Sequence, residues 1–210
     1  MSSKFRNHIS NNIFTTTFVS EDRKFIYTRP GRTAGTSIVN SLGRGDMEEI
    51  SRVYYYKKGT NDWLENTTDS EIENDYYKFT FVRNPFERIV SAWRAFHKNT
   101  GKVNSNFEIF IRNRGVGHLL YENGEFTNDH WFPQSNYVEY SDGSSFIDYV
   151  GKFENLEKDW KTLATKIEVK GTLTKARYST INYKSFYTTE LTKVVSDIYK
   201  RDLELFNYEF

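Results

Sequence analysis

Short apolar runs and amphipathic segments alternate along the chain from residue 24 onward. Residues 24–27, 78–82 and 149–153 form runs rich in aromatic and β-branched side chains, and each run predicts a buried strand. After each run, apolar residues recur at the spacing of a helix. Strands that alternate with helices indicate a parallel sheet with helices packed on both of its faces. The pattern therefore predicts an α/β fold of three layers, α/β/α, around a central parallel sheet.

The ends of the helices can also be predicted. Asn84 is a predicted N-cap, with Pro85 at the first helical position and Glu87 reaching back to the cap in a capping box. Ser105 and Glu108 form a similar pair at the start of a short helix. The apolar face of the helix after Asn84 is made by Phe86, Ile89, Val90, Trp93 and Phe96.

Three further helices follow from the same spacing. The first is predicted over residues 37–42, where Gly43 is placed to end it. The second is predicted over residues 154–167. The third is a C-terminal helix with a stripe made by Leu191, Val194, Val195, Ile198 and Tyr199.

Two parts of the chain lack such a pattern. Residues 43–74 are polar and contain turn-rich stretches at 57–61 and 66–70, so we expect loops there. Residues 1–22 are expected to form a peripheral N-terminal segment. The whole chain, residues 1–210, is expected to form a single domain, since its length and its 37% hydrophobic content suffice for one core.

The composition limits the chemistry and the partners. Because 29 Lys and Arg residues balance 28 Asp and Glu residues, no overall charge favours binding to nucleic acid or to a membrane. The absence of cysteine excludes disulfides and thiol catalysis, and the four histidines are too scattered for a metal cluster. Residues 1–12 lack an apolar segment, and no run approaches the roughly 20 apolar residues that span a bilayer. We therefore expect a soluble, cytoplasmic protein without a metal.

The loop after the first strand has the composition of an anion-binding loop. Its glycines allow the backbone to approach a ligand closely, and its hydroxyls and guanidinium groups can bind the oxygens of a phosphate or sulfate. The N-terminus of the following helix adds N–H groups and a positive dipole end. An ordinary glycine-containing turn is the alternative, and the lysine of a Walker A loop is missing. The candidate residues are Arg29, Gly31, Arg32, Thr33, Ala34, Gly35, Thr36 and Ser37.

A second candidate anion site follows the second strand. Arg83 lies at the end of that strand, and Ser91 lies about two turns into the next helix. Both side chains can therefore lie at the carboxyl edge of the sheet, where α/β folds bind ligands, and one phosphate can bridge them. The alternative is that Arg83 pairs with Glu87 and that Ser91 faces solvent.

The two motifs together resemble the paired signatures of the superfamily of sulfotransferases that use 3'-phosphoadenosine 5'-phosphosulfate (PAPS), and more closely its carbohydrate and membrane-associated branch. The family shows a Pro-Lys-Thr-Ala-Gly-Thr-Ser loop and a Val-Arg-Asn/Asp-Pro-x-x-Arg-x-x-Ser segment, which stand here at residues 31–37 and 82–91. The likeness continues at residues 129–135, 150–156 and 199–206. It implies a P-loop-NTPase-like sulfotransferase fold, PAPS as donor, PAP as product, no metal and a hydroxyl acceptor that is expected to be a carbohydrate.

The resemblance assigns roles to both motifs. It implies that Arg83 and Ser91 hold the 3'-phosphate of the donor and that residues 31–37 hold its 5' end. Arg32 stands where the family has a catalytic lysine. An arginine cannot donate a proton to the leaving phosphate, so Arg32 is expected to act by hydrogen bonding to the charge that develops there. A basic loop with Lys175, Arg177 and Tyr178 is placed where relatives close over the donor, although a solvated loop is the alternative.

The general base is the least determined part of the predicted site. Arg29 stands where many relatives carry a histidine, so the base must come from elsewhere. His130 is the first choice, with a structural role in its loop as the alternative. Trp131 or Tyr178 is a candidate for stacking on adenine. Lower-ranked candidates for the base are His97, His118, Asp46, Glu48 and Glu49.

Two other functions stay open at this level. A P-loop nucleotide kinase or nucleotidase would share the architecture, but the Gly-Lys-Ser/Thr sequence of that class is absent. A catalytically degenerate protein that binds PAP or a sulfated glycan is suggested by Arg29 and Arg32. The acceptor could also be a small molecule or a peptide tyrosine.

Overall fold

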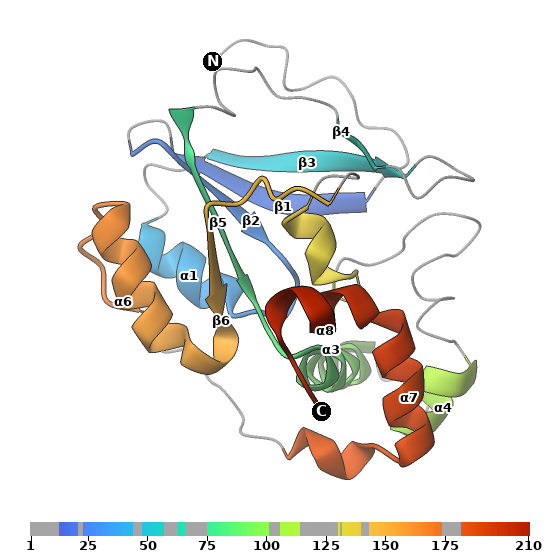
Figure 1. Cartoon of the computed structure of the whole chain (residues 1–210). Helices are drawn as coiled ribbons and strands as arrows, with labels where there is room; N and C mark the ends of the chain where they lie inside the picture. Colours follow the sequence, from blue (N-terminus) through green and yellow to red (C-terminus); the bar gives the residue numbers. More distant parts are fainter. Residues whose placement is uncertain are drawn as a thin grey trace.

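The computed structural model of the chain describes residues 13–20, 23–43, 48–56, 63–65, 75–100, 106–113, 130, 132–139, 143–173 and 182–210. Side chains are described in these ranges except at residues 13–17, 19, 48–56, 63–65, 96–100 and 113. Strands and helices together confirm the α/β class, and Figure 1 shows helices around a single sheet.

A six-stranded mixed sheet forms the centre, in the order β4-β3-β1-β2-β5-β6. The strands are β1 (Ile13–Ser20), β2 (Phe25–Arg29), β3 (Glu48–Tyr56), β4 (Trp63–Glu65), β5 (Tyr77–Val82) and β6 (Tyr149–Lys152). The three strands predicted from apolar runs are β2, β5 and β6, and these three are parallel to one another. The prediction of a parallel sheet is wrong for the other half, because β1 runs antiparallel to β2 and β3, and β3 runs antiparallel to β4.

The strands β1, β3 and β4 lie in stretches that were predicted to be peripheral or to form loops. Strand β1 is an interior strand between β2 and β3, so the expectation of a peripheral segment is wrong for residues 13–20. Strands β3 and β4 lie within residues 43–74. Strand β1 is rich in threonine and β3 in tyrosine, which favour strands although they are polar, so a search for apolar runs misses them, and β4 has only three residues.

The helices agree with the predicted amphipathic segments. They are α1 (Gly35–Leu42), α3 (Pro85–Thr100), α4 (Phe107–Asn113), α6 (Leu156–Lys166), α7 (Thr189–Ile198) and α8 (Lys200–Phe206), with 3-10 helices η3 (Gln134–Tyr137), η4 (Phe153–Asn155) and η5 (Tyr183–Phe186). Gly43 ends α1 with a positive φ of 82°, as predicted. The predicted C-terminal helix is divided into α7 and α8.

The N-cap of α3 is confirmed, but the capping box is wrong. The Oδ1 atom of Asn84 accepts a hydrogen bond from the N–H of Phe86 at 3.0 Å. Glu87 does not reach back to the cap, because its carboxylate accepts from Arg83 Nη2 at 2.7 Å. The N–H of Asn84 donates instead to Glu154 Oε1 at 2.7 Å. The carboxylate of Glu154, which follows β6, therefore takes the place of Glu87 at the N–H of Asn84.

The N-cap of α4 lies one residue later than predicted. Asn106 Oδ1 accepts from the N–H groups of Glu108 at 2.8 Å and Ile109 at 3.2 Å, so Asn106 rather than Ser105 is the cap. Glu108 pairs with Arg112 one turn further along the helix.

Aromatic side chains of β2 and β5 form a core beneath α1 and α6. The rings of Tyr27 and Phe79 stack with their centroids 5.0 Å apart. Ile38 and Leu42 of α1 and Trp160 of α6 pack against them. Burial of each such side chain contributes about 1.5–3 kcal/mol, so this layer holds the two strands that end at the candidate site.

The opposite face of the same strands meets η3 and α8. Val82 packs with Val138 and Phe206, and Thr28 Oγ1 donates to the carbonyl oxygen of Tyr137 at 3.4 Å. Both faces of β2 and β5 are therefore covered by helical elements among the described residues. The finer P-loop-like arrangement of three layers stays a prediction.

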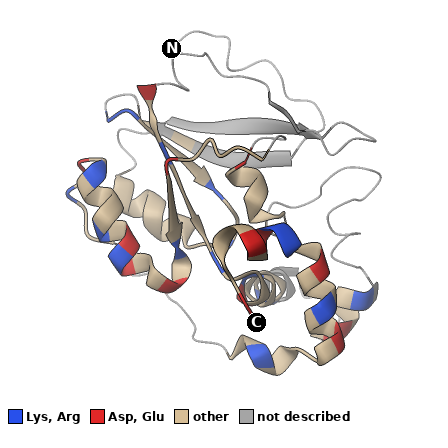
Figure 2. Ribbon diagram, in the orientation of Figure 1, with Lys and Arg blue, Asp and Glu red and all other residues tan. Residues whose placement is uncertain are grey.

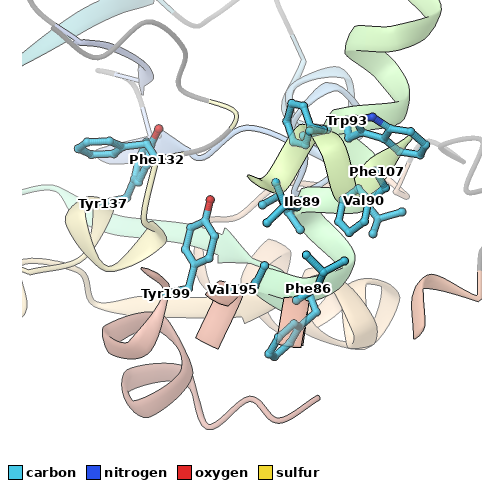
Figure 3. Close-up of a cluster of buried hydrophobic side chains, with 13 residues drawn as sticks. Phe86, Ile89, Val90, Trp93, Phe107, Phe132, Tyr137, Val195 and Tyr199 are labelled. Carbon is cyan, nitrogen blue, oxygen red and sulfur yellow. The ribbon is translucent and has the colours of Figure 1, made fainter. Parts of the chain in front are cut away.

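Helix α3 is packed by apolar residues from several other elements. Figure 3 shows Phe86, Ile89, Val90 and Trp93 of α3 close to Phe107, Phe132, Tyr137, Val195 and Tyr199. Trp93 and Phe107 meet edge to face with centroids 5.4 Å apart. Residues on more than one side of α3 are consequently buried, which places its polar residues in an enclosed environment.

Candidate functional site

The candidate residues gather where β2 and β5 end. These strands are parallel neighbours, paired from Phe25 with Tyr77 to Thr28 with Thr80. Their carboxyl ends therefore lie side by side, and the loop at 30–34 and the start of α3 leave the sheet at the same edge. Open α/β sheets bind ligands at this edge, and the candidate residues lie there as expected.

The loop after β2 has an unusual backbone. Arg32 and Ala34 adopt left-handed conformations with φ of 69° and 68°. The hydroxyl of Thr33 donates to the carbonyl oxygen of Pro30 at 2.8 Å and closes the turn. Ala34 is the N-cap of α1 and offers no side-chain acceptor to its N–H groups. A bound anion can take this role, because the N-terminus of a helix attracts negative charge.

Both glycines of the loop stand against other parts of the site. A Cβ atom on Gly31 would lie 2.8 Å from the Cα atom of His130, and a Cβ atom on Gly35 would collide with the side chain of Arg29. The absence of a side chain at Gly35 lets Arg29 cross the start of α1, where its Nη2 donates to Thr36 Oγ1 at 3.2 Å. The glycines therefore serve close packing within the site.

Replacement of Gly31 by Ala is expected to lower the free energy of unfolding by about 1–3 kcal/mol, the usual cost of overpacking a filled site. The added methyl group would force apart the loop and the backbone of His130. Denaturant titration of the variant and the wild type measures the loss. The matched control is Gly43→Ala, which has open space around it and only its positive φ to oppose the change. An unchanged unfolding midpoint for Gly31→Ala would contradict the contact.

Arg83 is buried, with 7% of its surface exposed. Its Nη2 donates to Glu87 at 2.7 Å, its Nη1 donates to the carbonyl oxygen of Arg32 at 3.3 Å, and its guanidinium lies 3.9 Å from the ring centroid of Phe153. The Nε atom is buried and has no partner among the described residues. The pairing with Glu87, which was the alternative to a binding role, is thus present. It leaves one buried donor of Arg83 unused.

Ser91 joins the two motifs. Its hydroxyl accepts from Arg32 Nε at 3.3 Å and from Arg32 Nη2 at 3.1 Å, and it is only 8% exposed. The alternative that Ser91 faces solvent is therefore wrong. Residues that are far apart in the sequence meet because β2 and β5 are neighbours.

The cationic groups of the site repel one another. Burial, and then the positive charge of Arg83, lower the pKa of Arg32 below its usual value. Of the carboxylates in the described part of the chain, only Glu87 bonds to Arg29, Arg32 or Arg83. Figure 2 shows Lys and Arg interspersed with Asp and Glu along α6 and α7, so the excess of positive charge at the site is local. An anion between Arg32 and Arg83 would relieve their repulsion.

His130 lies beside the first loop, as a candidate base must. Its backbone packs on Gly31, and its carbonyl oxygen accepts from Arg88 Nη1 at 3.3 Å. The side chain is half-buried. The structure therefore brings His130 to the loop, and its role as base stays a prediction.

Other predicted site residues lie outside the described part of the chain. These are Lys175, Arg177, Tyr178, Trp131, His118 and Asp46. The side chains of His97, Glu48 and Glu49 also lie outside it, although their backbone belongs to α3 and β3. Their roles stay predictions.

Sequence reasoning gave no role to Arg88, which is among the largest fully buried side chains. Its guanidinium donates to the carbonyl oxygens of His130 at 3.3 Å and Phe132 at 2.7 Å. Arg88 lies on the polar side of α3 in a helical projection, so periodicity alone places it in solvent. Its place as the second arginine of the segment 82–91 was the available signal. Gln134 and Asp202 are also fully buried. They were missed because a polar residue is expected to face solvent.

Comparison with known proteins gives a consistent set of matches. A model of the Sulfotransferase family matches residues 15–209. Carbohydrate sulfotransferase 11 of Rattus norvegicus is 29% identical over an alignment of 236 residues, which covers 90% of the chain and 66% of that protein, and the mouse protein of the same name gives the same values. Carbohydrate sulfotransferase 14 of Mus musculus is 31% identical over 40% of the chain and 27% of that protein. No solved structure matches significantly.

The matches correct the expected localisation. The chain spans 66% of the length of the first two relatives. Carbohydrate sulfotransferases such as these are Golgi membrane proteins. The expectation of a cytoplasmic protein is therefore wrong. It rested on the polar N-terminus and on the lack of a long apolar run, and neither feature determines the compartment. In the described part of the chain, no helix is long and apolar enough to cross a membrane.

Proposed function

The chain belongs to the sulfotransferase family, and from this premise we propose that it transfers a sulfonate group from PAPS to a carbohydrate hydroxyl and releases PAP. One observation supports this proposal above the others: Arg32 of the first motif donates to Ser91 of the second at 3.1 Å. The two candidate anion-binding motifs therefore lie next to each other. A donor with phosphates at both its 3' and 5' positions matches such a site.

The residues present fit an anionic donor. Arg83 has a buried Nε without a partner among the described residues, and Arg32 links it to the hydroxyl of Ser91, so Arg83 and Ser91 would hold the 3'-phosphate. Arg32 and the N-terminus of α1 would hold the 5' end, since Ala34 leaves that terminus without a side-chain cap. When bound, PAPS supplies the sulfonate that is transferred.

Arg32 would assist transfer by electrostatics. Burial and Arg83 lower its pKa, but a guanidinium remains protonated at neutral pH, so Arg32 does not act as an acid. It would donate hydrogen bonds to the negative charge that grows on the oxygen between sulfur and phosphorus as that S–O bond breaks. His130, which lies against Gly31, would accept the proton of the acceptor hydroxyl as the new S–O bond forms.

The proposed carbohydrate acceptor rests on the relatives. Carbohydrate sulfotransferases 11 and 14 are named for such an acceptor. Family membership also counts against the nucleotide kinase alternative. The absence of the family lysine at Arg32 keeps the degenerate binding protein as the competing hypothesis.

Transfer of radiolabelled sulfonate from PAPS to a panel of glycans tests the proposed activity, with PAP and ATP binding measured in parallel by calorimetry with and without magnesium. We expect label on at least one glycan and binding of PAP that needs no magnesium. Tight binding of ATP only with magnesium would favour a kinase. Binding of PAP without transfer to any glycan, with transfer restored by Arg32→Lys, would favour a degenerate protein.

A further inference from the structure

A chain of buried hydrogen bonds connects the C-terminal helix α8 to Arg83. Asp202 of α8 accepts from the N–H groups of Gln134 and Ser135, both at 2.8 Å. The side-chain Nε2 of Gln134 donates to Asp202 at 3.3 Å and to the carbonyl oxygen of Arg83 at 2.8 Å. Its Oε1 accepts from the N–H of Arg83 at 2.8 Å. One amide side chain therefore binds both backbone polar groups of Arg83.

The position of Arg83 in the fold explains why these contacts matter. Strand β5 ends at Val82, which is the last residue paired with β6. Arg83 lies one residue beyond the sheet, where no neighbouring strand is available to its N–H and C=O groups. The side chain of Gln134 takes the place of that strand. It fixes the backbone from which the guanidinium of Arg83 extends.

The contacts are fully enclosed. Gln134 and Asp202 are 0% exposed, and Arg83 is 7% exposed. Hydrogen bonds in such surroundings hold one geometry firmly, because an unpaired buried group is costly. The guanidinium, in contrast, keeps a buried Nε without a partner among the described residues.

We propose that Gln134 is a positioning residue for donor binding, which acts by holding the backbone of Arg83 so that its guanidinium meets the 3'-phosphate. This role rests on the proposed function, in which Arg83 holds that phosphate. Asp202 serves the same purpose from a second position, because it accepts two hydrogen bonds from Gln134 and one from the N–H of Ser135.

The test compares Gln134→Met with Trp160→Phe. Methionine keeps the length and volume of glutamine and removes both hydrogen bonds to Arg83. Trp160→Phe removes a partly buried hydrogen bond of 3.1 Å to Gly171 beneath the other face of the sheet, without a link to Arg83. Calorimetry with PAP, hydrogen exchange of the Arg83 amide, and the KM for PAPS and kcat are measured for both variants and the wild type.

For Gln134→Met we expect faster exchange of the Arg83 amide and a Kd for PAP raised between about tenfold and 100-fold, since misplacing a positioned group by about 1 Å can cost on the order of 100-fold. The KM for PAPS should rise more than kcat falls. Trp160→Phe should keep the wild-type Kd. If Gln134→Met does not fold, Asp202→Asn keeps the length of the side chain and one acceptor for the N–H groups of residues 134 and 135, and it should raise the Kd in the same direction.

Three results would count against this role, and each has a different meaning. If the wild type binds PAP and Gln134→Met binds it equally well while its Arg83 amide exchanges faster, Gln134 is structural only and the proposed function stands. If the wild type does not bind PAP, the proposed function fails first. A Kd raised equally by Trp160→Phe would show a general loss of stability and would overturn the positioning role.

Discussion

Replacement of Arg83 by Met is expected to weaken PAP binding by about 30-fold to 1,000-fold, because loss of one partner of a buried, hydrogen-bonded charge pair costs about 2–4 kcal/mol. Arg83 combines a buried position, an unused Nε and a backbone fixed by Gln134. Methionine keeps the apolar contact with the ring of Phe153 and removes the charge. Calorimetry at two salt concentrations measures the loss. The loss should be similar at both salt concentrations, since buried charges are screened little.

Glu87→Gln is the matched partner of that change and should act in the opposite direction. Glu87 accepts from Arg83 Nη2 at 2.7 Å and brings a negative charge next to the proposed phosphate position. Glutamine keeps the length and an acceptor but removes this charge, so PAP should bind to the variant more tightly than to the wild type.

If Arg83→Met folds and binds PAP with wild-type affinity, Arg83 is excluded from the donor site.

The half of the sheet that carries the site could be predicted from the sequence. Strands β2 and β5 are buried on both faces and therefore have continuous apolar runs, and the edge strand β6 next to them is half-buried. Strand β1 could not be predicted in this way, because its threonines are polar. Its place in the sheet depends on pairing with β3, whose residues lie more than 25 positions further along the chain. Local periodicity carries no information about such pairing.

The same distinction applies to the site. Arg32 and Ser91 were predicted because each lies in a local motif, a loop or the first two turns of a helix, whose chemistry is visible in a few residues. Arg88 and Gln134 were not predicted to have roles, because each acts through contacts with a distant segment. Periodicity tells which face of α3 is apolar, but it does not tell that the segment containing Phe132 covers the other side.

Arg32→Ala is expected to lower the rate of sulfonate transfer by about 100-fold to 1,000-fold, the usual cost of removing a donor that stabilises charge in the transition state. Binding of PAP should change less, because Arg83 and Ser91 remain. Single-turnover transfer at saturating PAPS separates the chemical step from binding. A variant whose kcat equals that of the wild type would show that Arg32 serves binding or structure alone.

Arg32→Lys should retain transfer but acquire a pH dependence that the wild type lacks. Burial and Arg83 lower the pKa of the group at this position, and the same surroundings would lower the pKa of a lysine. The protonated form assists the leaving phosphate, so transfer is fully present at pH values below the pKa of the lysine and is lost as the pH rises through it. Arginine stays protonated over the same range, so the wild type should show no such fall. The measurement is kcat as a function of pH, above neutral pH, for the wild type and for Arg32→Lys. Parallel profiles for the two proteins would mean that residue 32 carries no charge that transfer requires.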